Sequence, residues 1–539
     1  MMSVAVFLAV FRMVVLPVQF EDRPFAQSQQ QLRETVAQAE AYFRRQYGDA
    51  AGFQFDIAPV TTLAHPLAWY GANDGTRRDI RLHEAVREAV EAQQGQINFA
   101  LYDNDADGKV DNVCLLSAGR AEDDGGGEDA LWPQMSLLSE SGAAFSAGSK
   151  RIDRFTLCPE GRLGIFCHET AHVLGLPDFY GSDAASPGLW GTSLMDEGCR
   201  RDTPPDFDAL AFDLLGLGSS ETLAPGHYEL RPLLDGRRYL KAPTATEDEY
   251  FLFGVRDGGL LVYHIDRSDK PAGHSERYGA DLTARERWEK NVINENPEHP
   301  CARLMPANPD TPDVSGVPFP QSGVTVFASD TPSAFRSWDG RTGGLALTDI
   351  RSLPDGSVAF DVLEPILLTG LSVYQDAATV RWKCADALDD VLGFEIVCRS
   401  DAEEEFLQRL GPEAVSFTLE GLQPRTDYTL SVRVLTDAGA LFAADENFVT
   451  KVYREGSFPY IYLNNTTRNV DGTFPVGSKV PLRVFNATDV QEVRWTFDGR
   501  HISPEADGNY TLQRSGRLAA TIIHTDGTSE TLLKEITLQ

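Results

Sequence analysis

The stretch His168-Glu169-Thr170-Ala171-His172-Val173-Leu174-Gly175-Leu176-Pro177-Asp178 decides most about the fold and the chemistry of this chain. Residues four apart lie on one face of a helix, so a helix here presents His168 and His172 side by side. Two such imidazoles can bind one zinc ion, and Glu169 is placed to act as general base on a water bound to that zinc. The pattern HExxH by itself also occurs by chance in unrelated helices, so the residues that follow it matter.

The residues after the second histidine supply a third ligand. Gly175 can adopt the positive φ that ends a helix and turns the chain, and Pro177 prevents the helix from resuming. Asp178 can then reach the metal, which leaves the fourth zinc position for water, as in catalytic zinc sites. The alternative third ligand is Glu197, a downstream glutamate of the kind that thermolysin-like enzymes use. The glycine and the adjacent aspartate favour Asp178.

The composition is that of a globular protein with several domains. At about 100–200 residues per domain, a chain of 539 residues suggests three or four domains. The net charge of −32 argues against nucleic acid and against anionic membrane surfaces as partners. No stretch is long enough to span a bilayer. The apolar start, residues 1–11, lacks a basic leader and is predicted to be a poor signal peptide.

Seven cysteines are scattered along the chain, without a CxxC pair. This is not the pattern of a disulfide framework, and the odd number leaves at least one thiol without a partner in the same chain. Cys167 lies beside His168 but points away from the histidine face of the helix. It is expected to be a buried apolar residue.

Strands and helices alternate in the N-terminal part of the chain. Residues 14–20 and 110–118 read as strands, and residues 27–47 and 78–92 read as amphipathic helices. Such alternation predicts an α/β or α+β domain. The strand around residues 115–118 is a candidate edge along which an extended peptide could pair.

From about residue 364 the chain changes to short alternating strands separated by turns, which is typical of β-sandwiches. Residues 378–382 place Trp382 inward, and residues 422–428 resemble a tyrosine corner. Residues 364–452 therefore resemble a fibronectin type III domain. A second sandwich is expected over residues 455–539, beginning near Phe458, and its segments 493–499 and 516–522 resemble Ig-like or PKD-like modules.

A second metal-type pattern is the acidic loop Asp103-Asn104-Asp105-Ala106-Asp107-Gly108-Lys109-Val110-Asp111. Calcium prefers six to eight hard oxygen ligands. The loop offers the following oxygens: the carboxylates of Asp103, Asp105, Asp107 and Asp111, and the carbonyl of Lys109. An EF-hand would have a glutamate at its twelfth position, where this chain has Cys114. The alternative is an Asp- and Gly-rich turn that binds no metal.

Taken together, these residues resemble the M6 family of zinc metalloproteases, the immune inhibitor A type. Segments of that kind follow one another in order over residues 12–362: VVLPVQFED, YDNDADGKVDNV, GIFCHETAHVLGLPDFYG, GLWGTSLMD, GGLLVYHID and NVINENPEH. The resemblance implies a metzincin-like fold with a cleft between two subdomains, and extracellular endopeptidase activity. It also implies His168, His172 and Asp178 as zinc ligands, Glu169 as base, and Met195 as a Met-turn that packs beneath the histidines. No tyrosine closely follows Met195, so Tyr263 or His264 would have to replace the extra oxyanion donor of some metzincins, although a structural role in a strand fits them better.

The sequence thus predicts a multidomain protein: an α+β metzincin-like zinc metalloprotease domain over residues 12–362, followed by the two all-β sandwiches. The predicted function is that of a secreted or cell-surface zinc endopeptidase with protein or peptide substrates and structural calcium. The C-terminal domains would contact a cell-surface or extracellular matrix partner. The alternative is a catalytically vestigial adhesin or glycan- or protein-binding protein that acts through its β-sandwiches.

Overall fold

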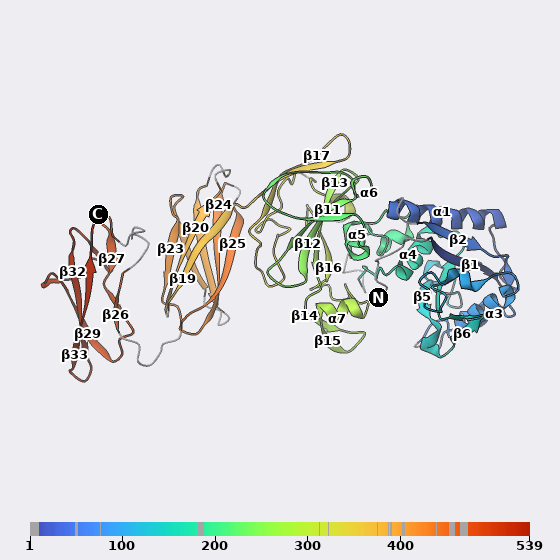
Figure 1. Cartoon of the computed structure of the whole chain (residues 1–539), viewed down its shortest axis with the longest axis horizontal. Coiled ribbons are helices and arrows are strands. Elements are labelled where there is room, and N and C mark those ends of the chain that lie inside the picture. Colours follow the sequence, from blue (N-terminus) through green and yellow to red (C-terminus); the bar gives the residue numbers. More distant parts are fainter. Residues whose placement is uncertain are drawn as a thin grey trace. The chain divides into compact units, whose positions relative to one another are not determined.

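The structure is a computed structural model of the chain (Figure 1). It describes residues 10–48, 52–75, 77–181, 188–311, 313–321, 323–374, 376–385, 388, 391–400, 405–437, 439–451, 459–463 and 473–539. Residues 1–9, which make up most of the predicted signal peptide, and Phe458, the expected start of the second sandwich, lie outside these ranges. The chain divides into two compact units, Met1–Leu363 and Glu364–Gln539.

The first unit begins with a mostly parallel sheet of six strands. Its strand order is β2-β1-β4-β8-β5, with β3 also paired to β1, and only β5 runs antiparallel to its neighbour. The strands are β1 (Phe11–Gln19), β2 (Phe53–Ile57), β3 (Thr61–Thr62), β4 (Val113–Ser117), β5 (Gln134–Leu137) and β8 (Arg154–Pro159). The helices are α1 (Gln29–Tyr47), α2 (Leu67–Tyr70), α3 (Leu82–Gln93) and α4 (Leu163–Val173), and a small hairpin consists of β6 (Phe145–Ala147) and β7 (Lys150–Ile152).

Both faces of this sheet are buried, because successive side chains of a strand point to opposite faces. In β1, Met13 and Val15 face a core shared with α1 and α4, while Val14 and Leu16 face a second core shared with α3. In Figure 1, α1 runs along one side of β1 and β2, and α3 lies on the other side. The predicted alternation of strands and helices is therefore found as a helix–sheet–helix arrangement.

Two predicted helices begin later than expected, for local reasons. α1 begins after Ser28, whose side chain accepts a hydrogen bond from the backbone N–H of Gln31 in a capping box. The helix predicted over residues 78–92 begins only at Leu82. Asp79 has a φ of 49°, and its buried carboxylate accepts a hydrogen bond from the backbone N–H of Trp132. A left-handed residue cannot be part of an α-helix, so the residues before Leu82 form a turn.

The expectation that residues 115–118 form an open edge is wrong. They belong to β4 and the residue after it, and β4 lies inside the sheet between β1 and β8. Its backbone groups are already paired on both sides. Among the described residues, β5 has β8 as its only ladder partner and so forms one edge of the sheet, with β2 at the other end.

The second half of the first unit is mainly β structure. A five-stranded sheet has the order β16-β13-β12-β11-β9, and a three-stranded sheet has the order β10-β18-β17; their apolar side chains share one core. The strands are β9 (Ser219–Thr222), β10 (Gly226–Leu230), β11 (Arg238–Pro243), β12 (Glu249–Arg256), β13 (Gly259–Asp266), β14 (Pro271–Ser275), β15 (Ala280–Thr283), β16 (Ala302–Met305), β17 (Ala346–Ser352) and β18 (Val358–Leu363). The helices are α5 (Ala209–Leu215), α6 (Leu233–Gly236) and α7 (Ala284–Glu289). The unit also has short 3-10 helices: η2 (Phe99–Tyr102), η3 (Glu122–Asp124), η4 (Leu138–Ser141), η5 (Glu197–Arg200) and η6 (Val314–Gly316).

The second unit begins with a β-sandwich of the expected kind. One sheet has the order β19-β20-β23 and the other β22-β21-β24-β25. The strands are β19 (Ile366–Val373), β20 (Ala377–Cys384), β21 (Gly393–Ser400), β22 (Glu405–Leu410), β23 (Ser416–Glu420), β24 (Asp427–Thr436) and β25 (Gly439–Val449). Trp382 is buried, as predicted. The hydroxyl of Tyr428, at the start of β24, accepts a hydrogen bond from the backbone N–H of Gln423 at 2.9 Å, which fixes the corner.

The rest of the second unit is also β structure. Its sheets pair β26 with β28, β27 with β31, and β30-β29-β32-β33 in that order. The strands are β26 (Tyr460–Tyr462), β27 (Lys479–Pro481), β28 (Arg483–Phe485), β29 (Val490–Phe497), β30 (Arg500–Ile502), β31 (Asn509–Thr511), β32 (Gly516–His524) and β33 (Ser529–Ile536). Trp495, Phe497 and Leu518 lie in its core. In the part of the chain that the structure describes, no helix is long and apolar enough to cross a membrane.

Candidate active site

Helix α4 carries the HExxH residues into the interior of the first unit. Nearly all of its residues are buried, including Cys167, as predicted for that thiol. Gly164 allows the helix to approach η5 closely, because a Cβ at this position would lie 2.1 Å from the carbonyl oxygen of Cys199. The helix ends at Val173, and Gly175 follows with a φ of 107°. The chain then turns back, as the glycine predicted.

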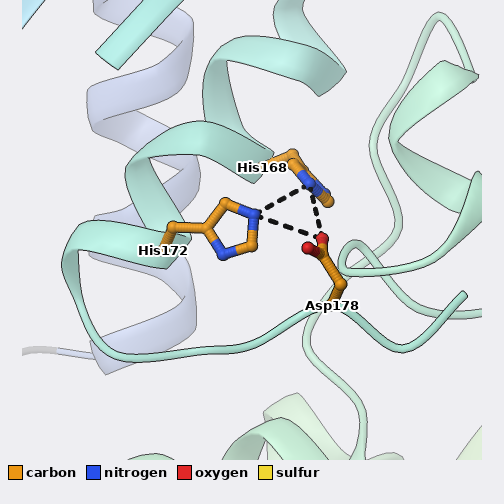
Figure 2. Close-up of side chains that lie close together, drawn as sticks. All are labelled: His168, His172 and Asp178. Atoms are coloured by element: carbon orange, nitrogen blue, oxygen red, sulfur yellow. Dashed lines mark hydrogen bonds and ion pairs between the residues drawn. The ribbon is translucent and has the colours of Figure 1, made fainter. Parts of the chain in front are cut away.

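The turn brings Asp178 to the two histidines (Figure 2). Nε2 of His168 lies 3.1 Å from Nε2 of His172. Oδ1 of Asp178 lies 3.3 Å from the first of these nitrogens and 3.2 Å from the second. All three side chains are largely buried. They form one of two groups among the described residues whose side chains come close enough to share a metal ion.

The hydrogen bonds of the two histidines determine which ring nitrogens face Asp178. Nδ1 of His168 lies 2.9 Å from the carbonyl oxygen of Leu194, and Nδ1 of His172 lies 2.8 Å from that of Leu176. A carbonyl oxygen only accepts hydrogen bonds, so each neutral ring carries its proton on Nδ1. Both Nε2 atoms then present lone pairs to each other and to a carboxylate oxygen.

Three lone-pair donors at this separation fit a divalent cation. Oδ1 of Asp178 is buried and has no hydrogen-bond partner among the described residues. Two imidazole nitrogens and one carboxylate oxygen are a donor set that suits zinc. Burial acts to raise the pKa of Asp178, but the contacts with His168 and His172, in their protonated forms, hold it far below its ordinary value.

Glu169 adds a buried carboxyl group beside the three donors. Its side chain is 5% exposed. Burial raises its pKa, while the charges of the two neighbouring histidines act in the opposite direction. A raised pKa brings a carboxyl group closer to the range in which it can exchange a proton near neutral pH.

Met195 is fully buried in the core that surrounds α4. The residue before it, Leu194, provides the carbonyl for His168, and the carbonyl of Met195 itself accepts a hydrogen bond from the N–H of Phe179 at 2.7 Å. The segment around Met195 therefore contacts both the first histidine and the residue next to Asp178. The backbone of this segment supports the site.

The remaining candidates from the sequence lie elsewhere. Glu197 points into solvent and pairs with Arg200, and it does not join the group of three. Tyr263 is buried in the second sheet, and Nε2 of His264 lies 2.7 Å from a carboxylate oxygen of Glu249. These contacts agree with the structural role in a strand that the sequence favoured for both residues.

Two residues near the site were missed by the sequence reasoning. The ring of Tyr180 lies nearly parallel to that of His168, with centroids 6.5 Å apart, and its hydroxyl contacts Asp178. Its place two residues after Asp178 was the available signal. Asn291 binds Asp178 from a segment 113 residues further along the chain. Only the motif NVINENPEH pointed to that segment, and it gave no role for the asparagine.

The acidic loop forms the second group, but it brings together fewer carboxylates than predicted. Carboxylate oxygens of Asp103, Asp105 and Asp111 come together, whereas the carboxylate of Asp107 does not join them. Asp107 instead accepts a hydrogen bond from the N–H of Lys109 at 2.8 Å.

Asp103 is already engaged within this loop. Its Oδ2 pairs with the ammonium group of Lys150 and accepts a hydrogen bond from the N–H of Gly108. Burial acts to raise the pKa of Asp103, but these contacts hold it below its ordinary value. The side chain of Asp103 is 1% exposed, and its other oxygen has no hydrogen-bond partner among the described residues.

Comparison with known proteins agrees with these features. Residues 17–203 match the model of the immune inhibitor A peptidase M6 catalytic domain, and residues 365–448 match the fibronectin type III domain. The chain therefore contains a metallopeptidase domain followed by a β-sandwich module. The first of these is similar to the catalytic domain of the peptidase M6 family over residues 17–203, as its sequence motifs indicated.

Two curated relatives match the same region. Immune inhibitor A of Bacillus thuringiensis subsp. alesti is 26% identical over 200 residues, which is 31% of this chain and 29% of that protein. Pre-pro-metalloprotease PrtV of Vibrio cholerae serotype O1 is 28% identical over 176 residues, which is 27% of this chain and 19% of that protein. The matches thus span less than a third of the length of either relative.

Solved fibronectin type III domains also resemble part of the chain. The domain of human contactin 1 is 20% identical with a TM-score of 0.15, covering 17% of this chain and 82% of that one. The domain of the human collagen alpha-1(XX) chain is 27% identical with a TM-score of 0.16, covering 17% and 86%. TM-scores of this size add nothing to the family match.

Proposed function

We propose that the protein is a secreted or cell-surface zinc endopeptidase. The observation that carries this proposal is the convergence of two imidazole nitrogens and the carboxylate of Asp178 within 3.1–3.3 Å, next to the buried Glu169. His168, His172 and Asp178 would hold the zinc, and Glu169 would be the general base. A catalytic domain of the peptidase M6 family at the same residues supports this reading. We assign the whole of residues 12–362 to a metzincin-like catalytic domain.

Held by His168, His172 and Asp178, a zinc ion would supply Lewis-acid chemistry, which lowers the pKa of a bound water and polarises a carbonyl. Glu169 takes the proton of the attacking water and delivers it to the leaving amine. The carbonyl oxygens of Leu194 and Leu176 accept the Nδ1 protons, which in the neutral rings leaves both Nε2 atoms as lone-pair donors. The burial of Glu169 raises its pKa, which suits a group that must both accept and donate a proton.

Strand β5 is our proposed binding edge for an extended peptide substrate. It forms one edge of the sheet, and it contacts helix α4, which carries the histidines. An extended peptide can add to such an edge by main-chain hydrogen bonds. The pairing of β4 on both sides excludes the edge that the sequence suggested.

We propose a structural calcium ion for the acidic loop. The three converging carboxylates and the unpartnered oxygen of Asp103 support it, whereas the ion pair with Lys150 competes with it.

The two C-terminal β-sandwich regions are proposed to contact a partner at a cell surface or in the extracellular matrix.

Replacement of Glu169 by glutamine tests the proposed reaction. Glutamine keeps the size of the side chain but cannot take a proton, so we expect the variant to bind one zinc per chain and to hydrolyse casein roughly 10²–10⁴-fold more slowly. Glu197→Gln is the matched control, because Glu197 is exposed and pairs only with Arg200; it should keep full activity. Wild-type activity in Glu169→Gln would exclude the role of this residue. Zinc stoichiometry near zero in the wild type would favour the vestigial adhesin.

A further inference from the structure

Asp178 is held by one side chain from a distant part of the chain. Its backbone N–H donates to Oδ1 of Asn291 at 2.8 Å. In return, Nδ2 of Asn291 donates to Oδ2 of Asp178, also at 2.8 Å. The planar amide of one asparagine thus binds both the backbone and the carboxylate of the same residue.

This double contact fixes the direction of the carboxylate. A carboxylate with one backbone anchor could rotate and exchange its two oxygens. With Oδ2 bound to Asn291, Oδ1 is the oxygen that faces the two histidines, 3.3 and 3.2 Å from their Nε2 atoms. It is also the oxygen without a hydrogen-bond partner among the described residues. The amide of Asn291 therefore holds Oδ2 of Asp178 and leaves Oδ1 to face a metal.

Asn291 is itself held in place by its surroundings. It follows helix α7 with a φ of 51°, a left-handed conformation that asparagine tolerates better than most residues. The indole N–H of Trp288, in α7, donates to the carbonyl of Asp266 at 2.7 Å. After Asn291, the N–H of Val292 returns to the carbonyl of Arg287 at 3.0 Å. The turn that presents the amide is thereby tied to α7 and to the end of β13.

A second asparagine of the same segment holds the residues after Asp178. Asn294 is fully buried, and its Nδ2 donates to the carbonyls of Phe179 and Ala302 at 2.6 and 2.8 Å. Gly181 pairs with Asn294 in an isolated bridge. The segment from Asn291 to Asn294 therefore contacts Asp178 and the residues that follow it.

We propose that Asn291 is the positioning residue of the third zinc ligand. It presents Oδ1 of Asp178 to the two histidines, so the metal site requires a residue from outside residues 17–203, the part that matches the catalytic domain model. A neutral amide is needed, because an aspartate there could not donate to Oδ2 and would repel it. This inference rests on the proposed zinc site.

Two variants test the role of the amide. Asn291→Gly deletes the side chain and suits the positive φ, so it removes the hydrogen bonds without backbone strain. Asn291→Asp keeps the shape but replaces the donor by a second negative charge. Asn296→Ala is the matched control: its Nδ2 donates to the carbonyl of Ala272 at 2.9 Å in the same segment, and no contact with Asp178 is found among the described residues. The full-length metal-free protein is titrated with Zn²⁺ against a chromophoric chelator, and its melting temperature is measured.

We expect both Asn291 variants to bind Zn²⁺ about 10–100-fold more weakly, as is usual when the hydrogen-bond partner of a metal ligand is lost. The control should bind zinc like the wild type. In an Asp178→Ala background, Asn291→Gly should cause no further loss of affinity, because the residue that it orients is absent. Wild-type affinity in Asn291→Gly, or an equal loss in the control, would overturn the inference and leave the zinc site intact. A wild type that binds no zinc would overturn both.

Discussion

The segment His168–Asp178 and the loop Asp103–Asp111 both show metal-ligand spacing in the sequence, yet the fold treats their ligands differently. At the histidine site, the Nε2 atoms and Oδ1 of Asp178 face one another. The hydrogen bonds to other residues are made by the Nδ1 atoms of the two rings and by Oδ2 of Asp178. In the acidic loop, the carboxylates bind the backbone N–H groups of the loop itself and the ammonium group of Lys150. A buried ligand without an internal partner is costly to bury unless a cation binds it. The partners of the ligands, more than their spacing, therefore separate the two sites.

The largest expected difference between the two regions is in zinc affinity. Binding of zinc by four protein ligands is worth roughly 10–16 kcal/mol, or about 2.5–4 kcal/mol for each ligand. We expect Asp178→Ala and His172→Ala to lower zinc affinity roughly 70- to 900-fold, the ratio to which that energy corresponds. Asp105→Ala, in the acidic loop, should leave zinc affinity unchanged. Titration against a chelator measures all three. A loss of zinc in Glu197→Ala with no loss in Asp178→Ala would instead indicate a thermolysin-like ligand set.

The ion pair in the acidic loop is expected to have the next largest effect. Lys150→Met leaves the carboxylate of Asp103 without its cation. Because Lys150 is 22% exposed, water weakens the pair, and its loss costs about 1.5–3 kcal/mol. We expect a lower melting temperature without calcium and a larger recovery on adding calcium than in the wild type. Differential scanning calorimetry with and without 1 mM Ca²⁺, a concentration of the order that extracellular calcium modules bind, tests this.

Lys109→Met is the matched control for that experiment, because Lys109 is exposed and lies 3.5 Å from Asp107, outside the three converging carboxylates. Its removal should change neither the melting temperature nor the response to calcium. If calcium stabilises the Lys150→Met variant no more than the wild type, the loop is a turn held by Asp side chains and binds no calcium.

Much of the histidine site could be predicted because it is local. The four-residue spacing of His168 and His172 defines a helical face, and the positive φ of Gly175 brings Asp178 back over only a few residues. The strands and helices of the parallel sheet also followed from their periodicity. What the sequence could not give were contacts made across long distances in the chain. Asn291 reaches Asp178 from 113 residues away.

The wrong predictions have the same origin. Residues 115–118 read as a strand, and they are one, but whether a strand is central or at an edge depends on its neighbours, β1 and β8. The calcium ligands were assigned from a loop pattern, and the pattern could not show that Asp107 lies outside the group of three carboxylates or that Lys150 pairs with Asp103. The helix start predicted at residue 78 was displaced to Leu82 because Asp79 takes a left-handed turn and binds Trp132.

The smallest expected effect comes from replacing one glycine in each of the two segments. Gly175 and Gly108 have φ values of 107° and 93°, and a Cβ at either position would meet no atom within 4 Å. Alanine at each position therefore introduces backbone strain alone, about 1–2 kcal/mol. We expect both variants to melt a few degrees below the wild type. Only Gly175→Ala should also weaken zinc binding, by up to about tenfold, since part of the strain is relieved by moving Asp178 away from the histidines. Equal zinc affinity in the two variants would mean that Asn291, rather than the turn at Gly175, determines where Asp178 lies.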